Sequence, residues 1–274
     1  MLPFSRRPTV LLAVLLVALA GVLTVPTPAL AATPVPAPVV LQLGDSLMWQ
    51  TCGGAAQLVT SDAPAYLRQH DGGCYGWSGA TAADMAFMVG GGRFLSNGPG
   101  QPHPYLPGRG LVDPYDLREA IDRADVLVFS LGTNEANRAD PVNGCGVRTQ
   151  TPWPVQIDRP AAAGGDVVPC QLTPAQFAEH IDYFMWLASG RPVFWFDIAV
   201  TDPADPAYGQ QRQFNDQIWA AAGRYPNLHP VAWARAVAAH PDWLRADGVH
   251  LNSPAGNAGR YATLLAALTG CGLR

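Results

Sequence analysis

The 274-residue sequence contains no lysine, and its seventeen basic residues are all arginines. After Arg6 and Arg7 these arginines are scattered, and the formal net charge is −4. Nucleic-acid-binding proteins usually carry a clustered basic surface, so no nucleic-acid partner is expected. Charged residues are also sparse, at 14%, whereas 49% of the residues are hydrophobic. This composition excludes a disordered chain and allows a sizeable core.

The sequence has no apolar run long enough to cross a bilayer. The longest, Val10–Leu23, is shorter than the roughly 18 to 20 residues that a spanning helix needs. It follows Arg6 and Arg7 and precedes Ala29-Leu30-Ala31, an A-x-A pattern typical of signal-peptide cleavage. We therefore predict a secreted protein without a stable membrane anchor. The predicted parts are a signal peptide over 1–31, a proline-rich leader over 32–38 and one domain over 39–274.

Cysteine is scarce, with five residues in no Cys-x-x-Cys or Cys/His spacing. We therefore predict neither a zinc site nor any other metal or cofactor. An exported chain permits disulfides, and proximity in the sequence favours pairing Cys52 with Cys74 and Cys145 with Cys170. Cys271 would then be a free thiol. Five cysteines allow fifteen ways to form two bridges, so other pairings stay open.

Short apolar runs alternate along the chain with helical patterns. Strands are predicted at Val39–Leu43, near Cys74–Trp77, at Val126–Leu131 and at Pro192–Ala199. Helices are predicted at Thr81–Val89, Asp113–Ala124, Thr173–Ala188 and Tyr208–Ala222, with Thr173 as an N-cap before Pro174. This alternation predicts an α/β fold, a mainly parallel sheet with helices on both faces. Ligands of such sheets bind at the carboxyl ends of the strands.

Two stretches rich in proline and glycine interrupt the alternation, Asn97–Gly110 and Asn137–Pro169. Loops of this length inside a domain often have a function. We predict that they form walls of a cleft or, with equal weight, surface elaborations without a role in binding.

Residues suited to nucleophilic catalysis follow the predicted strands. Ser46 lies in Gly44-Asp45-Ser46-Leu47, where glycine allows the sharp turn that would present the hydroxyl. Asp247 precedes His250 by three positions, which can bring its carboxylate to Nδ1 and leave Nε2 facing Ser46. A serine becomes a nucleophile when a histidine accepts its proton and an acid orients that histidine. We therefore predict Ser46 as nucleophile, His250 as base and Asp247 as orienting acid.

Acyl transfer also requires hydrogen-bond donors for the oxyanion. The candidates are the backbone N–H groups of Ser46 and Gly79 and the side-chain amide of Asn134. Asp197, near another strand end, is the alternative orienting acid. Asp45 is expected to bond neighbouring backbone without a catalytic role. Each such residue alone is more often a turn or capping residue, but their joint occurrence at strand ends favours catalysis.

Other side chains receive no catalytic role. Trp49, Trp77 and Trp153 suit contact with acyl chains or sugar rings, but Trp49 and Trp77 are at least as consistent with core packing. The remaining histidines show no metal-ligand spacing and are predicted to be surface or loop residues: His70, His103, His180, His229 and His240.

The order of these motifs resembles that of the SGNH (GDSL) hydrolases. The matching blocks are Gly44–Leu47, Gly79, Gly132–Asn134 and Asp247–His250. The resemblance spans about Val39 to Leu268 and implies a three-layer α/β/α sandwich with a five-stranded, flavodoxin-like sheet. It implies the same triad, with Gly79 and Asn134 as oxyanion donors. Met48 replaces the last glycine of a Gly-x-Ser-x-Gly elbow, which argues against an α/β-hydrolase.

The resemblance implies a secreted esterase or lipase that forms an acyl-enzyme on Ser46. An alternative with the same triad is a carbohydrate or glycan O-acyl esterase, or an acyltransferase. A binding module without turnover is the third class, which the complete triad disfavours. The expected substrates are small-molecule, lipid or glycan esters, and the expected state is a monomer. The abundance of Ala, Arg, Gly and Pro indicates a GC-rich genome and, with the resemblance, an actinobacterial type of enzyme.

Overall fold

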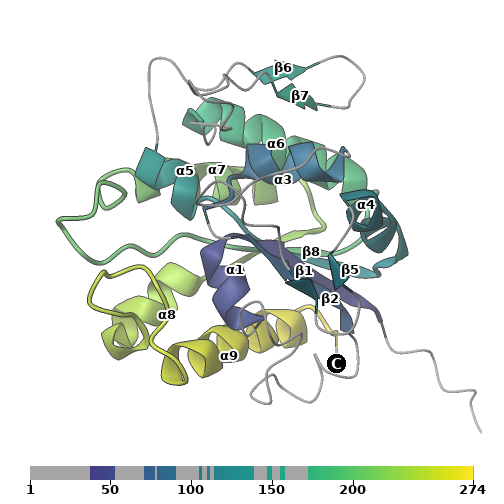
Figure 1. The fold of residues 1–274 in the computed structure, drawn as a ribbon. Coiled ribbons are helices and arrows are strands. Elements are labelled where there is room, and N and C mark those ends of the chain that lie inside the picture. Colours follow the sequence, from purple (N-terminus) through teal and green to yellow (C-terminus); the bar gives the residue numbers. More distant parts are fainter. Residues whose placement is uncertain are drawn as a thin grey trace, which may run out of the picture. The chain divides into compact units, whose positions relative to one another are not determined.

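A parallel sheet lies between two layers of helices in the computed structural model (Figure 1). The structure describes residues 38–52, 71–77, 79–90, 105–106, 110–111, 114–138, 147–149, 155–157 and 172–273. The predicted signal peptide and nearly all of the predicted leader lie outside these residues.

The sheet contains five strands in the order β2-β1-β5-β8-β9, and every pairing is parallel. Its strands are β1 (Val40–Gly44), β2 (Asp71–Gly76), β5 (Val126–Ser130), β8 (Val193–Phe196) and β9 (Leu228–Val231). Numbered along the chain, this order is 2-1-3-4-5, which is the flavodoxin-like order. The structure therefore confirms the predicted α/β/α sandwich and its five-stranded parallel sheet.

Helices follow the strands along the chain. They are α1 (Ser46–Thr51), α3 (Ala82–Val89), α4 (Pro114–Arg123), α5 (Thr133–Arg138), α6 (Pro174–Ala188), α7 (Gln211–Arg224), α8 (Trp233–Ala239) and α9 (Ala255–Gly270), with a 3-10 turn at Pro241–Trp243. Thr173 caps α6 as predicted, because its side chain accepts from the N–H of Gln176. Two antiparallel pairs, β3 (Tyr105–Leu106) with β4 (Gly110–Leu111) and β6 (Val147–Thr149) with β7 (Val155–Ile157), fall in or beside the predicted loops.

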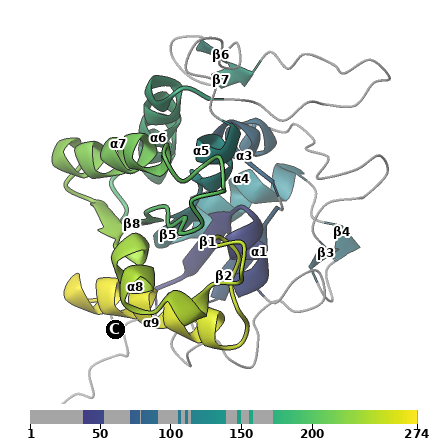
Figure 2. The ribbon, with the colours of Figure 1, turned by 90° about the vertical axis from the view of Figure 1, so that its left-hand side faces the viewer.

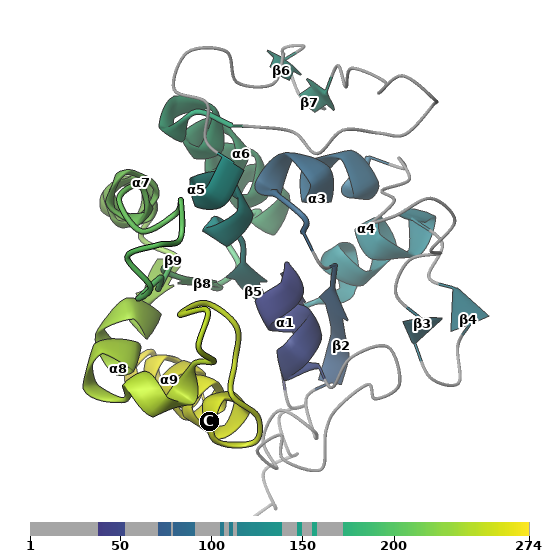
Figure 3. The ribbon, with the colours of Figure 1, turned by 60° about the vertical axis from the view of Figure 1, so that its left-hand side comes forward.

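Alternate side chains of the strands enter two separate apolar clusters. Leu41, Phe129 and Trp195 pack with α3, α4, α6 and α7 on one face of the sheet. Val40 and Val128 pack with α1, α8 and α9 on the other face. Figure 2 shows α6 and α7 on one side of the strands and α8 and α9 on the other, and Figure 3 shows the same division. A buried parallel sheet needs such cover on both faces, which explains its nearly continuous apolar strands.

Some boundaries differ from the predictions. The strand predicted to reach Ala199 ends at Phe196, because side chains of α7 bond the backbone that follows. Asn215 bonds both the N–H and the carbonyl of Ile198. The helix predicted from Tyr208 begins at Gln211, after successive tight turns. Strand β9, the short strands β3, β4, β6 and β7, and helices α1, α5, α8 and α9 were not predicted.

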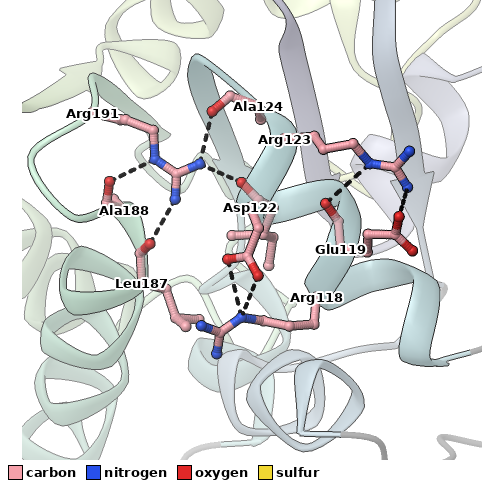
Figure 4. A network of polar contacts seen from close by, with 9 residues as sticks. Arg118, Glu119, Asp122, Arg123, Ala124, Leu187, Ala188 and Arg191 are labelled. Atoms are coloured by element: carbon pink, nitrogen blue, oxygen red, sulfur yellow. Dashed lines mark hydrogen bonds and ion pairs between the residues drawn. The ribbon is translucent and has the colours of Figure 1, made fainter.

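Arg191 joins the C-terminal ends of α4 and α6 just before β8 (Figure 4). Its Nε and Nη2 donate to the carbonyls of Ala188 and Leu187, each at 2.7 Å. Its Nη1 donates to the carbonyls of Ala124, at 2.7 Å, and Ile121. The last carbonyls of a helix lack partners within the helix, so one guanidinium satisfies the ends of two helices.

A disulfide joins Cys52, the C-cap of α1, to Cys74 in β2. This is the first of the two predicted pairs. Cys145 and Cys170 lie outside the described residues, and Cys271 carries a free, exposed thiol. In the part of the chain that the structure describes, no helix combines the length and apolar character needed to cross a bilayer.

Candidate active site

The candidate site lies at the carboxyl edge of the sheet, where the strand order reverses between β1 and β5. Ligands of open parallel sheets bind at this position. Helix α1 begins directly after β1, so Ser46 is its first residue. The motif that contains Asn134 follows β5, the neighbouring strand. The fold therefore brings two of the predicted site elements to the same edge.

Local packing fixes the turn that carries Ser46. The buried carboxylate of Asp45 caps α1 by accepting from the N–H of Leu47 at 2.9 Å. A Cβ on Gly44 would approach the carbonyl oxygen of Ser130 to 2.5 Å, so only glycine fits between β1 and β5 here. At the first position of a helix, the N–H of Ser46 has no acceptor within the helix, which leaves it suited to bind an oxyanion.

The structure brings Ser46, His250 and Asp247 together in one hydrogen-bonded chain. Ser46 Oγ lies 3.2 Å from Nε2 of His250, and Nδ1 of His250 lies 2.9 Å from Oδ2 of Asp247. A proton on Nδ1 that donates to Asp247 leaves Nε2 as the acceptor for the Ser46 hydroxyl. The structure thus brings together the three residues that were predicted as nucleophile, base and orienting acid.

The surroundings of Asp247 keep its carboxylate ionised. Partial burial opposes the charge, but the N–H groups of Val249 and His250 both donate to Oδ1, at 3.0 and 2.9 Å. These bonds and the His250 ring lower the pKa of Asp247 below its ordinary value. A charged carboxylate at this position holds the imidazole in the orientation that faces Ser46.

The residues from Arg245 to Leu251 form a short hairpin. The N–H of Arg245 donates to the carbonyl of His250 at 2.7 Å, and Leu244 pairs with Leu251 as an isolated bridge. Gly248 has a φ of +68°, and a Cβ there would lie 2.3 Å from the backbone nitrogen of Asp202. The hairpin therefore needs glycine to pack against the loop that follows β8.

Helix α5 supports the loop that contains Gly79 at two points. The side-chain amide of Asn134 donates one N–H to the carbonyl of Ala80 at 2.9 Å. The carboxyl of Glu135 accepts from the N–H of Ala82. An amide has two N–H donors, so the bond to Ala80 orients the group and leaves its second N–H for an oxyanion. Gly79 is buried, with a φ of +82°, in this same loop.

Asp197 does not take the place of Asp247 beside His250. Its Oδ1 accepts from the N–H of Ala234 at 2.7 Å, at the start of α8. Burial raises the pKa of Asp197 to about 6, although this N–H, Trp219 and Arg260 oppose the shift. Asp197, the alternative orienting acid, therefore caps the N-terminus of α8.

The surface around Ser46 is hollowed into a pocket. Its lining consists of Ser46, Thr133, Asn134, Asp205, Ala207, Asp247, Val249 and His250. Asp205 and Ala207 come from the loop between β8 and α7, whose contribution was not predicted. The available signal was its position after a strand, together with the turn-forming sequence Asp202-Pro203-Ala204-Asp205-Pro206.

Charged side chains are buried near Ser46 and its neighbour Asp45. Arg260 donates from Nη2 to Ser130 Oγ at 2.5 Å, and Ser130 Oγ donates to Oδ1 of Asp45 at 3.4 Å. The guanidinium carbon lies 3.8 Å from the ring centroid of Phe196. Burial raises the pKa of Asp45 to about 6 against the attraction of Arg260, and lowers the pKa of Arg260 to about 10. As expected, Asp45 bonds neighbouring backbone.

One prediction for the remaining side chains was wrong. His180 was expected at the surface, but it is fully buried in α6, where Nδ1 lies 2.7 Å from the carbonyl of Gln176. Burial lowers its pKa to about 4, so it is neutral at pH 7. Trp77 packs in the core, whereas Trp49 is 37% exposed. His70, His103 and Trp153 lie outside the described residues.

No group of three or more His, Cys, Asp or Glu side chains in the described ranges could hold a metal ion.

No protein-family model matches the sequence, and no curated protein is similar to it in sequence. Solved structures match the fold. LAE5, an alpha/beta hydrolase enzyme from the metagenome of Lake Arreo, Spain, aligns with a TM-score of 0.50 at 15% identity, over 88% of this chain and 98% of that chain. The lipase/acylhydrolase from Enterococcus faecalis aligns with a TM-score of 0.50 at 14% identity, over 85% and 96% of the two chains.

A third match is a Parabacteroides merdae protein named as a GDSL-like lipase, with a TM-score of 0.50 and 15% identity over 86% of this chain and 96% of that chain. At these identities the likeness shows a shared fold. It covers nearly the whole length of each matched protein.

Proposed function

We propose that this chain is an SGNH (GDSL) hydrolase that cleaves carboxylic esters as a serine esterase. The observation that carries the proposal is the unbroken chain of contacts from Ser46 through His250 to Asp247. The pocket around these residues and the named activities of two matched structures, a lipase/acylhydrolase and a GDSL-like lipase, support it.

In the first half-reaction Ser46 Oγ attacks the ester carbonyl carbon, and Nε2 of His250 accepts the hydroxyl proton. The carbonyl oxygen gains negative charge, which the N–H groups of Ser46 and Gly79 and the amide of Asn134 stabilise. The tetrahedral intermediate then breaks its bond to the alcohol oxygen. That oxygen leaves with the proton from His250, and the acyl group remains on Ser46.

In the second half-reaction His250 removes a proton from water, which attacks the acyl carbon. The ester bond to Ser46 breaks, its oxygen recovers the proton, and a carboxylic acid is released. The side chains of His250 and Asp247 are 38% and 46% exposed, so solvent reaches the base directly.

The proposed setting is outside the cell, after removal of residues 1–31, where the enzyme acts as a monomer on small-molecule, lipid or glycan esters. The Cys52–Cys74 disulfide supports this setting, because such bonds persist in oxidising compartments.

The test is hydrolysis of p-nitrophenyl esters from acetate to palmitate by residues 32–274, beside the Ser46→Ala variant. We expect turnover by the unchanged protein and none by the folded variant. A maximum on short chains would indicate a carboxyl or carbohydrate esterase, and one on long chains a lipase. Equal turnover by both proteins would overturn the proposal. Loss of the acyl group to an added alcohol, rather than to water, would identify a transferase.

A further inference from the structure

Helix α1 directs two polar side chains at the hairpin formed by Arg245 to Leu251, which is called the histidine hairpin below. Ser46 and Gln50 are four residues apart and therefore lie on the same face of the helix. Ser46 Oγ contacts the ring of His250, and Oε1 of Gln50 accepts from the N–H of Leu251 at 3.0 Å. One helix face thus holds two consecutive residues that are about 200 positions away in the sequence.

Most other bonds of the hairpin are internal to its own segment. The exception is the carbonyl of Gly248, which accepts from the N–H of Thr201 at 2.9 Å and from its hydroxyl at 3.3 Å in the loop after β8. Arg245 donates from its backbone N–H to the carbonyl of His250, and from Nε to the carbonyl of Leu251 at 2.9 Å. The N–H of Asn252 donates to the carbonyl of Trp243 at 2.8 Å. These bonds fix the shape of the hairpin but not its distance from α1.

Apolar packing brings α1 and the hairpin close without setting their register. Leu47 and Met48 belong to the same buried cluster as Leu244 and Leu251. Such contacts are nondirectional and do not by themselves specify a hydrogen-bonding geometry. The bond from Leu251 to Gln50 is directional and is anchored on the helix that carries the nucleophile.

The two contacts behave differently during the proposed reaction. Formation of an acyl-enzyme removes the Ser46 hydroxyl hydrogen, so its bond to His250 is lost in the acylated state. The bond from Leu251 to Gln50 involves no reacting atom and persists. We propose that Gln50 is a positioning residue, which keeps His250 at its working distance from the Ser46 ester and the attacking water. This inference rests on the proposed function.

The test compares two substitutions that separate packing from hydrogen bonding. Gln50→Met keeps a side chain of similar length and removes the acceptor, whereas Gln50→Glu keeps an acceptor for the N–H of Leu251. Gln213→Met, on the exposed face of α7, makes the same chemical change away from the site. All three are measured for kcat, KM and thermal unfolding beside the unchanged protein.

We expect Gln50→Met to lower kcat by about 10- to 100-fold, with KM within about twofold, because small misplacements of a base slow proton transfer. Gln50→Glu should recover most of kcat. Gln213→Met should match the unchanged protein.

Two results would overturn the role of Gln50. The first is a kcat for Gln50→Met within twofold of that of the unchanged protein, while Ser46→Ala is inactive. The proposed esterase function would then be kept, and the positioning role of Gln50 would be rejected. The second is a kcat for Gln50→Glu as low as that of Gln50→Met.

If the unchanged protein hydrolyses no ester, the proposed function fails, and NMR still tests the positioning. Faster exchange of the Leu251 amide and a shifted His250 ring signal in Gln50→Met would support it. Unchanged signals would refute it.

Discussion

Ser46 and His250 are separated by 204 positions in the sequence, yet Ser46 Oγ lies 3.2 Å from Nε2 of His250. The two residues reach this distance through different structures. Ser46 is placed by a strand and the helix cap that follows it, and His250 by a hairpin between α8 and α9. Substitutions in the turn that carries Ser46, in the hairpin that carries His250, or among the buried groups around them should therefore change activity or stability.

Replacement of Asn134 by alanine should lower kcat by about 10² to 10³, since an oxyanion donor acts mainly on the transition state. Asn227→Ala is the matched control, because its Nδ2 also donates to a backbone carbonyl, that of Arg191, at 2.7 Å. Steady-state kinetics on one ester should show the loss for Asn134→Ala alone. Similar kcat values for the two variants would remove Asn134 from the oxyanion site.

Glu135 makes the stability of the fold depend on pH. Burial raises its pKa from 4.5 to about 8, the bond from Ala82 opposes the shift, and the nearby charge of Asp45 adds to it. Between pH 4.5 and about pH 8, the Glu135 carboxyl is ionised in the unfolded chain but stays protonated in the folded chain. Glu135 should therefore reduce stability as pH rises from 4.5 to 8, by up to about 1.4 kcal/mol per pH unit.

Urea unfolding at pH 5, 6, 7 and 8 checks this dependence against Glu135→Gln, which keeps an acceptor for the N–H of Ala82. The variant should gain stability relative to the unchanged protein at each step towards pH 8. Glu119→Gln, at an exposed position of α4, should follow the unchanged protein. Parallel curves for Glu135→Gln and the unchanged protein would show that Glu135 is ionised in the fold.

Arg191 should contribute far more to stability than an exposed arginine. Arg191→Met removes the side-chain donor from four carbonyls at the ends of α4 and α6, of which Ala188 and Ile121 keep a backbone donor, at a cost of about 2 kcal/mol or more. Arg224→Met removes an exposed ion pair with Asp182 and should cost less than about 1 kcal/mol. Free energies of unfolding in urea give both values, and equal losses would contradict the capping role of Arg191.

The Cys52–Cys74 disulfide should raise the melting temperature. The bond closes a loop of 22 residues, which corresponds to about 3 kcal/mol in the chain-entropy model. For a domain of this size, reduction should lower Tm by about 6 to 12 °C. The double variant Cys52→Ser/Cys74→Ser is measured in the same way. Any change in the Tm of the double variant on reduction comes from other cysteines. A change as large as that of the unchanged protein would contradict the prediction.

The sheet and the candidate residues Ser46, Asp247 and His250 could be picked out because their signals are local. Alternating apolar runs indicated the strands, and the three-residue spacing of Asp247 and His250 indicated their contact. His180 also had a local signal that was not used. Phe177, His180, Ile181 and Phe184 follow the i, i+3, i+4, i+7 spacing of one helix face, and all four are buried.

The rest of the site depends on contacts between distant segments, which periodicity does not reveal. The bond from Leu251 to Gln50 spans 201 positions, and neither residue belongs to a recognisable catalytic pair. Asp205 lines the pocket from the loop after β8, and Gly248 lets the histidine hairpin pack against that same loop. Both arrangements result from the assembled sheet rather than from the local sequence.

Because His250 lies between α8 and α9, its contact with Ser46 can form only late in the synthesis of the chain. Synthesis delivers Ser46 early, whereas His250 and then α9, which covers one face of the sheet, come last. A growing chain therefore carries a serine with no proton acceptor until almost every other element has been made. The proposed ester cleavage therefore requires segments from both ends of the described domain in one folded chain.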